Sequence, residues 1–129
     1  MVDLVPTYIA HRLAANLQSA ARWVAWLSRR YTIEPVCPWI VLASQWDESD
    51  RALGLEIDLV AIRRVRAFVA TGPEWSSGVR TEADEFMRFT YGKLPVSLVG
   101  FDGPTDLTDG ELSALDAEMA RRGIVRRHA

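Results

Sequence analysis

Hydrophobic and polar positions alternate along the 129-residue chain with two different periods. Short apolar runs predict strands, and stretches in which apolar residues recur every three or four positions predict helices. The strand pattern covers residues 5–10, 32–36, 66–71 and 94–100. The helical pattern covers about 14–30, 50–65, 79–91 and 108–122. Strands and helices are therefore expected to follow one another in strict alternation.

Local signals set several of these boundaries. Thr108 and Glu111 have the spacing of a helix capping box, and Gly92 and Gly123 are typical helix stops. Residues 39–49 fit neither period, and we interpret them as a loop over the edge of the sheet. Residues 101–107 are also expected to form a loop.

This alternation predicts an α/β fold: one domain over residues 1–129, with a flavodoxin/Rossmann-like parallel sheet and flanking helices. In such sheets the ligand crevice lies at the carboxyl ends of the strands, where the strand order reverses. With a flavodoxin-like order, the first and third strands flank that point. Residues 8–12 and 72–82 are then the places to search for chemistry.

Two carboxylates fall on apolar helix faces when the helices are drawn at 100° per residue. Glu82 lies on the arc that carries Phe86, in what is expected to be the first turn of its helix, and Asp58 lies beside Ile62. A buried carboxylate needs a partner or a function. The alternative is that Asp58 caps a loop or pairs with an arginine, and that Glu82 only favours a helix terminus.

Ser76, Ser77 and Gly78 stand directly before the helix that carries Glu82. Backbone N–H groups at such a helix start can bind an anion, and glycine allows close approach. An ordinary N-cap is the alternative explanation.

Taken together, these residues resemble the nucleoside 2-deoxyribosyltransferase superfamily, which includes deoxynucleoside-monophosphate N-glycosidases. The resemblance spans about residues 6–99. It rests on Tyr8 in the first strand, on Asp58, on the turn from Ser76 to Glu82, and on the sequence separation of 24 residues from Asp58 to Glu82.

The resemblance implies roles for these residues. Glu82 would attack the anomeric carbon, Asp58 would pass a proton to the leaving base, and Tyr8 would orient Glu82. A serine at position 76, where transferases of free nucleosides carry an acid, favours a nucleoside 5′-monophosphate. Ser77 and Gly78 would help to bind that substrate. No metal or other cofactor is expected.

The chain departs from the family pattern after the first strand, where His11 and Arg12 replace a small glycine-containing turn. Arg12 would contact a phosphate, or both side chains would narrow the pocket. His11 would assist proton transfer or be structural. Family members complete the pocket with a residue from a neighbouring subunit, so a homodimer or higher homo-oligomer is expected.

Composition and charge limit the partners and the cellular location that we expect. A net charge of −2 provides no basic surface for a nucleic-acid polymer. The single cysteine, Cys37, allows no internal disulfide and suggests a reducing compartment. The sequence shows no signal peptide and no membrane-spanning apolar run, so the expectation is a cytoplasmic protein. His11, Cys37 and His128 lack the spacing of metal ligands.

Three other functions stay open at this point. A phosphoribohydrolase also uses a glycine-rich turn that leads to Thr and Glu, but the paired glycines expected after Pro73 are missing. A non-catalytic nucleotide-binding or sensing module would keep the pocket without turnover. A purely structural partner protein would bind no ligand.

Overall fold

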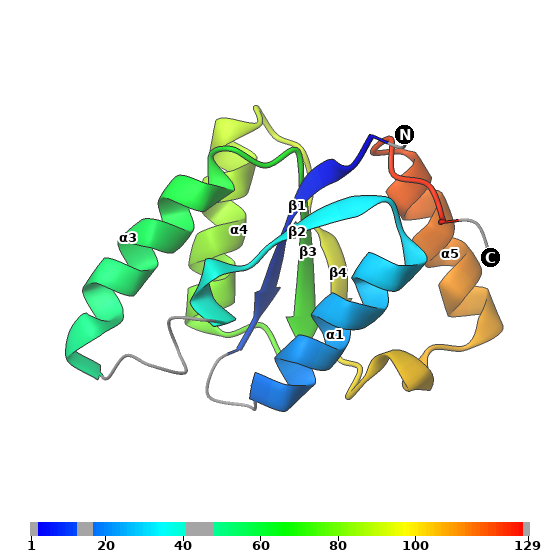
Figure 1. Cartoon of the computed structure of the whole chain (residues 1–129), viewed down its shortest axis with the longest axis horizontal. Coiled ribbons are helices and arrows are strands. Elements are labelled where there is room, and N and C mark those ends of the chain that lie inside the picture. The colour runs from blue at the N-terminus through cyan, green and yellow to red at the C-terminus, as the bar shows by residue number, and fades with distance from the viewer. Residues whose placement is uncertain (1–2, 13–16, 41–47, 128–129) are drawn as a thin grey trace.

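The four strands form one parallel sheet in the computed structural model, which describes residues 3–12, 17–40 and 48–127 (Figure 1). They are β1 (Val5–His11), β2 (Ile33–Val36), β3 (Ala67–Gly72) and β4 (Val96–Val99). Their order is β2-β1-β3-β4, and every neighbouring pair is parallel. The predicted α/β class and the flavodoxin-like order of the first and third strands are confirmed.

Helices cover both faces of the sheet (Figure 1). The chain contains α1 (Leu17–Arg30), α3 (Arg51–Ile62), α4 (Ser77–Phe89) and α5 (Asp109–Ala120), with 3₁₀ turns η1 (Glu48–Asp50) and η2 (Pro104–Asp106). Side chains of α1 and α5 share one buried cluster with the sheet, and side chains of α3 and α4 share the other. The connection from β1 to β2 runs one way along the sheet, and the connections from β2 to β3 and from β3 to β4 run the other way. Right-handed crossovers therefore place α1 on one face and α3 and α4 on the other.

Alternation along β1 decides which side chains meet which helices. Ile9 points into the cluster that contains Trp23 of α1, whereas Tyr8 points into the cluster that contains Phe86 of α4. Tyr8 is paired in register with Phe68 of β3, and the two rings stack with centroids 5.4 Å apart. The hydroxyl of Tyr8 is thereby placed under α3 and α4.

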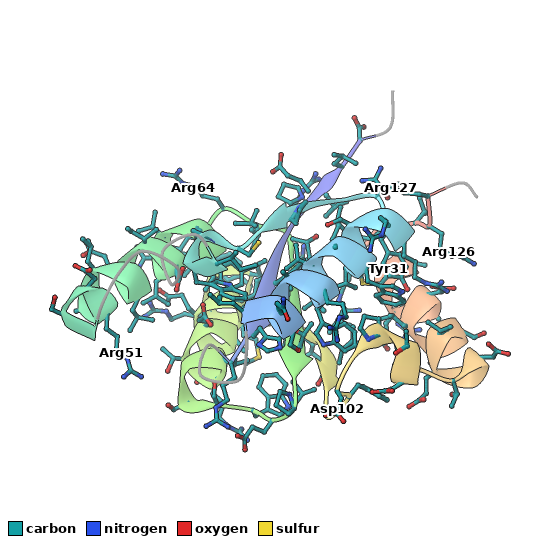
Figure 2. The ribbon with its side chains drawn as sticks, turned by 60° about the horizontal axis from the view of Figure 1, so that its bottom comes forward. Tyr31, Arg51, Arg64, Asp102, Arg126 and Arg127 are labelled. Carbon is teal, nitrogen blue, oxygen red and sulfur yellow. The ribbon has the colours of Figure 1, made fainter. Side chains whose placement is uncertain are left out.

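The carboxyl-terminal segment is tied back to the end of α1. The hydroxyl of Tyr31 donates to Asp116 of α5 at 2.5 Å, and Tyr31 forms an antiparallel bridge with Arg126 (Figure 2). The backbone N–H of Arg127 donates to the Arg30 carbonyl at 2.8 Å. These bonds fix residues 126–127 beside the end of α1.

Several predicted boundaries need correction. The second predicted helix ends at Ile62 and not at residue 65, because a turn at residues 63–64 carries the chain into β3. Val65 lies after this turn but is buried, so the apolar pattern of the sequence continues past the end of the helix. The fourth strand begins at Val96 and not at 94, because Pro95 has no N–H for the ladder and Leu94 is exposed. The 101–107 loop contains η2.

Some of the predicted elements include residues that the structure does not describe. Residues 14–16 of the first predicted helix and 41–47 of the ambiguous stretch lie outside the described residues. The capping box of α5 is confirmed, because the Thr108 hydroxyl accepts from the Glu111 N–H and the Glu111 carboxylate accepts from the Thr108 N–H. No helix within the described ranges is long and apolar enough to cross a membrane.

Candidate active site

Three predicted site residues meet on the face of the sheet that α3 and α4 cover. Tyr8 comes from the middle of β1, Asp58 from α3 and Glu82 from α4. The hydroxyl of Tyr8 donates a short hydrogen bond to the carboxylate of Glu82. Asp58 lies close enough to Tyr8 for each group to shift the pKa of the other. Residues 74 positions apart in sequence are thus joined through one hydroxyl group.

Both carboxyl groups are almost fully buried. Only 7% of Glu82 and 8% of Asp58 are exposed. Asp58 Oδ1 is buried and has no hydrogen-bond partner in the described chain. No described arginine pairs with Asp58, since Arg63 of the same helix region binds Glu85 instead. Asp58 therefore forms no ion pair with an arginine among the described residues.

Burial controls the protonation of the pair. It raises the pKa of Asp58 from 3.8 to about 7, against the opposing effect of the Tyr8 hydroxyl. It raises the pKa of Glu82 from 4.5 to about 8, again opposed by Tyr8 and reinforced by the charge of Asp58. Burial and both acids also raise the pKa of Tyr8, which stays a proton donor. Two acids that hold their protons near neutral pH can both donate and accept them.

The position of Glu82 differs from the sequence prediction in one respect. Because α4 begins at Ser77, Glu82 lies in its second turn, so the expectation of a first-turn carboxylate is wrong. The free N–H groups of the helix start do not stabilise its charge, and burial dominates its pKa.

The turn before α4 forms a regular helix cap. The Ser76 hydroxyl accepts from the Val79 N–H at 3.2 Å, as the N-cap alternative predicts. Ser77 and Gly78 are exposed at the start of the helix. The Arg80 guanidinium lies 5.7 Å from the centroid of the Trp75 ring, which places a cation and an aromatic ring next to this turn.

His11 fills the switch point between β1 and β3. Its Nδ1 donates to the Arg12 carbonyl at 2.9 Å, and Nε2 lies 3.3 Å from the Ser19 hydroxyl. The ring stacks 6.4 Å from Trp39, and a Cβ on Gly72 would come within 3.4 Å of it. Burial lowers the pKa of His11, so the ring is neutral at pH 7.

Arg12 is also engaged. It forms an ion pair with Glu74, in the loop after β3, and both side chains are substantially exposed. The structure therefore brings His11 and Arg12 to the carboxyl edge of the sheet but not into contact with the Tyr8, Asp58 and Glu82 cluster.

One buried acid was missed by the sequence analysis. Glu85 of α4 is as buried as Asp58, and its carboxylate binds Arg88 on its own helix and Arg63 at the end of α3. The spacing of Glu85 and Arg88 indicates a helical ion pair. Nothing in the sequence indicates that α3 supplies a second arginine. The charge of Glu85, which lies one turn after Glu82 on the same helix, is thus balanced by these two arginines.

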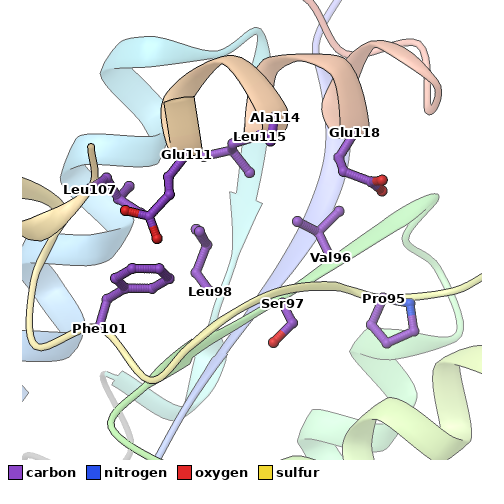
Figure 3. Close-up of a pocket in the computed structure, with 10 residues that line it drawn as sticks. All are labelled: Pro95, Val96, Ser97, Leu98, Phe101, Leu107, Glu111, Ala114, Leu115 and Glu118. Carbon is purple, nitrogen blue, oxygen red and sulfur yellow. The ribbon is translucent and has the colours of Figure 1, made fainter. Parts of the chain in front are cut away.

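A cavity of about 300 Å³ lies elsewhere, between β4 and α5 (Figure 3). Val96, Leu98 and Phe101 form part of its apolar lining, and the carboxylates of Glu111 and Glu118 lie at its side. Glu111 is occupied by its capping box, and Glu118 is paired with two arginines of its own helix end. This cavity therefore offers no unpaired carboxylate to a ligand. A second cavity, of about 520 Å³, lies between β2 and α3.

No family model matches this chain, and no curated protein and no solved structure matches it significantly. No group of three or more histidine, cysteine, aspartate or glutamate side chains in the described part of the chain could hold a metal ion. The functional argument therefore depends on the geometry and protonation of the carboxyl cluster.

Proposed function

We propose that this chain acts in the cytoplasm as an N-glycosidase or deoxyribosyltransferase on a nucleoside or nucleoside 5′-monophosphate. The observation that carries the proposal is the buried cluster of Tyr8, Glu82 and Asp58, in which the Tyr8 hydroxyl donates to Glu82 and Asp58 lies close enough to influence the pKa of both groups. Retaining glycosidases, which form a covalent intermediate, typically use two carboxyl groups, one as nucleophile and one as acid.

The proposed reaction has two steps. Asp58, protonated near neutral pH, donates its proton to the leaving base while the bond from the anomeric carbon to the base nitrogen breaks. Glu82 acts in its ionised form, which is the minor form at pH 7 because its pKa is about 8, and its carboxylate forms an ester bond to that carbon. Water, or a second base, then attacks the same carbon and returns Glu82 as the leaving group, and Asp58 recovers a proton. Tyr8 supports the first step because its hydrogen bond favours the ionised form of Glu82.

The turn at Ser76 is proposed to hold the 5′ end of the substrate. The Ser76 hydroxyl and the exposed N–H groups of Ser77 and Gly78 would accept a phosphate better than a carboxylate at position 76 would. Arg12 would join them by leaving Glu74, its partner in the free protein. A 5′-monophosphate is therefore the preferred substrate in this proposal.

The test is release of free base, followed by liquid chromatography, from ribo- and deoxynucleosides and their 5′-monophosphates, with and without an acceptor base. The expected result is release from at least one substrate that is lost in Glu82→Gln and slowed in Asp58→Asn. Glu85→Gln is the matched control, because it removes an equally buried carboxylate of the same helix that already has partners. Release that survives Glu82→Gln would refute the assigned nucleophile.

A second candidate is a nucleotide-binding module without turnover. The specific observation that favours it is the position of His11, whose ring is packed against Gly72 at the switch point. Well-folded protein that binds nucleotides but releases no base from any substrate would favour this function over the first. Release from ribonucleoside 5′-monophosphates alone would instead favour a phosphoribohydrolase.

A further inference from the structure

The amino-terminal edge of the sheet carries an exposed apolar group. This edge is the end of the molecule at which the strands begin, at the top of Figure 1, and it lies opposite the crevice at their carboxyl ends. Four large apolar side chains are exposed there: Leu4 (40%), Tyr91 (100%), Leu94 (66%) and Val125 (57%). Single exposed apolar residues are ordinary, but a group of them at one end of a domain indicates a contact surface.

Hydrogen bonds hold the segments that carry these side chains together. The Thr32 N–H donates to the Val125 carbonyl at 2.9 Å, and the Val5 N–H donates to the Thr32 carbonyl at 3.1 Å. The segments with Leu4 and Val125 therefore meet at the start of β2. The Arg122 guanidinium donates to the Leu94 carbonyl at 3.0 Å, which joins the end of α5 to the loop before β4.

Tyr91 is held in an unfavourable backbone conformation. Among the described residues it is the one non-glycine position with a positive φ, +56°, and Gly92 continues the same turn with +94°. A tyrosine rarely adopts this left-handed region, because its Cβ then approaches the backbone. Its ring is fully exposed, so no packing in the free protein offsets the cost. A strained residue that displays an aromatic ring indicates a contact made with a partner.

The same edge is basic, although the net charge of the chain is −2. Three carboxylates there are each shared by two arginines, so that one positive charge remains in every group. The groups are Asp116 with Arg30 and Arg126, Glu118 with Arg121 and Arg122, and Glu85 with Arg63 and Arg88.

Further cations at this edge have no carboxylate partner. Five of them form no ion pair with any described residue: Arg29, Arg64, Arg66, Lys93 and Arg127. Asp3 and Glu34 are the exposed acids that oppose them within the described chain. Figure 2 shows Arg64, Arg126 and Arg127 on one side of the molecule and Asp102 on the opposite side. We call the four apolar side chains and these five cations together the amino-edge surface.

An anionic lipid bilayer matches both properties of this surface. Apolar and aromatic side chains enter the boundary between head groups and acyl chains, and neighbouring Arg and Lys attract the negative head groups. A nucleic acid would match the cations and stack on Tyr91, but the aliphatic side chains of Leu94 and Val125 favour lipid. Such a contact lies on the bilayer surface and requires no spanning helix.

We propose that the amino-edge surface binds an anionic phospholipid membrane. Tyr91 and Leu94 insert at the level of the head groups, and Arg66 and Lys93 contact lipid phosphates. The crevice at the carboxyl ends of the strands then faces away from the membrane. This proposal does not rest on the proposed function, because it uses none of the residues of the carboxyl cluster.

Cosedimentation of the full chain with lipid vesicles tests the proposal. The probes are vesicles of phosphatidylcholine with about 30% phosphatidylserine and vesicles of phosphatidylcholine alone. The chain is expected to bind the anionic vesicles and to bind the neutral ones at least about tenfold more weakly. Salt at about 0.5 M is expected to release most of the bound protein, because it screens the attraction.

A charge variant tests the role of the cations. Lys93→Glu is expected to weaken binding to the anionic vesicles at least about fivefold, the contribution of one cation near an anionic surface. Arg22→Glu is the matched control. It makes the same change in net charge in the first half of α1, beside Gly103 and away from the amino edge, and is expected to bind as the wild type does.

Apolar variants test insertion. The double variant Tyr91→Asn and Leu94→Ser is expected to weaken binding at least about fivefold, because it removes the inserted side chains. Asparagine tolerates a positive φ, so the turn is kept. Leu53→Ser is the matched control, since Leu53 is 50% exposed in the first turn of α3, at the opposite edge. Circular dichroism checks that each variant is folded.

Several results would overturn the proposal. They are a lack of binding to the anionic vesicles, equal binding to both compositions, and equal effects of an edge variant and its control. RNA retardation in a gel that is lost in Lys93→Glu, without binding to vesicles, would assign the amino-edge surface to a nucleic acid instead.

Discussion

The buried carboxyl of Glu82 makes a prediction about stability that requires no knowledge of the substrate. The substitution Glu82→Gln keeps the size of the side chain and an oxygen that accepts from Tyr8, but it removes the titrating group. We expect this variant to be more stable than the wild type at neutral and alkaline pH. The advantage should be smallest at pH 5.

The magnitude follows from proton linkage. Folding raises the pKa of Glu82 from 4.5 to about 8, so between these values the folded protein keeps a proton that the unfolded chain releases. Stability is then fully present below pH 4.5 and falls as pH rises through about 8. At about 1.36 kcal/mol per pH unit, the contribution of Glu82 falls by roughly 2–3 kcal/mol between pH 5 and pH 7. By pH 9 the fall reaches about 4 kcal/mol.

The assay is urea unfolding of the wild type and the variant at pH 5, 7 and 9. Glu85→Gln serves as the matched control, since Glu85 lies on the same helix at similar burial but binds Arg63 and Arg88. Removing that carboxylate loses both ion pairs and should destabilise the protein by about 1–2 kcal/mol. The two substitutions are therefore expected to have opposite signs at pH 7.

Equal pH slopes for the wild type and Glu82→Gln would refute this reasoning, because they would show that Glu82 is ionised in the folded protein at every pH measured. A destabilised Glu82→Gln protein at pH 9 would do the same. Neither outcome would contradict the proposed reaction, in which Glu82 acts as the ionised nucleophile and Asp58 as the acid.

Three further predictions concern single residues. Tyr8→Phe removes the hydrogen-bond donor that favours ionised Glu82, so the pKa of Glu82 should rise above 8. Base release at pH 7 should then fall about tenfold or more, and the midpoint of the pH–rate profile should move to higher pH. Thr108→Ala removes the N-cap of α5 and should reduce the free energy of unfolding by about 1 kcal/mol in urea; an unchanged midpoint would contradict the cap. Gly72→Ala should destabilise by about 1 kcal/mol or more, measured as a lower Tm, because Gly72 has φ of +108° and a Cβ would approach His11.

Much of the fold is predictable from local periodicity. β1 was expected at 5–10 and spans Val5–His11, and the capping box at Thr108 placed the start of α5 to within one residue. Parallel pairing followed from the alternation of strands and helices alone. These features depend on interactions between residues close in sequence or on general rules of chain connection, which a single sequence displays.

The arrangement of the site is only partly predictable. Helical geometry identified Asp58 and Glu82 as acids on apolar faces, and the structure places both beside Tyr8. The burial of Glu85 was missed because its partner Arg63 comes from another helix, and such tertiary contacts leave no periodic signal. The packing of His11 against Trp39 depends in the same way on where two distant segments meet.

The unpaired oxygen of Asp58 has a practical consequence for finding the ligand. A buried acceptor without a donor leaves the empty protein less stable than it would be with that hydrogen bond made. A small molecule that donates to Oδ1 binds the folded state alone and raises its melting temperature in proportion to the logarithm of its concentration. A thermal-shift screen of nucleosides, nucleotides and free bases would therefore report binding directly, whether or not the bound molecule is ever turned over.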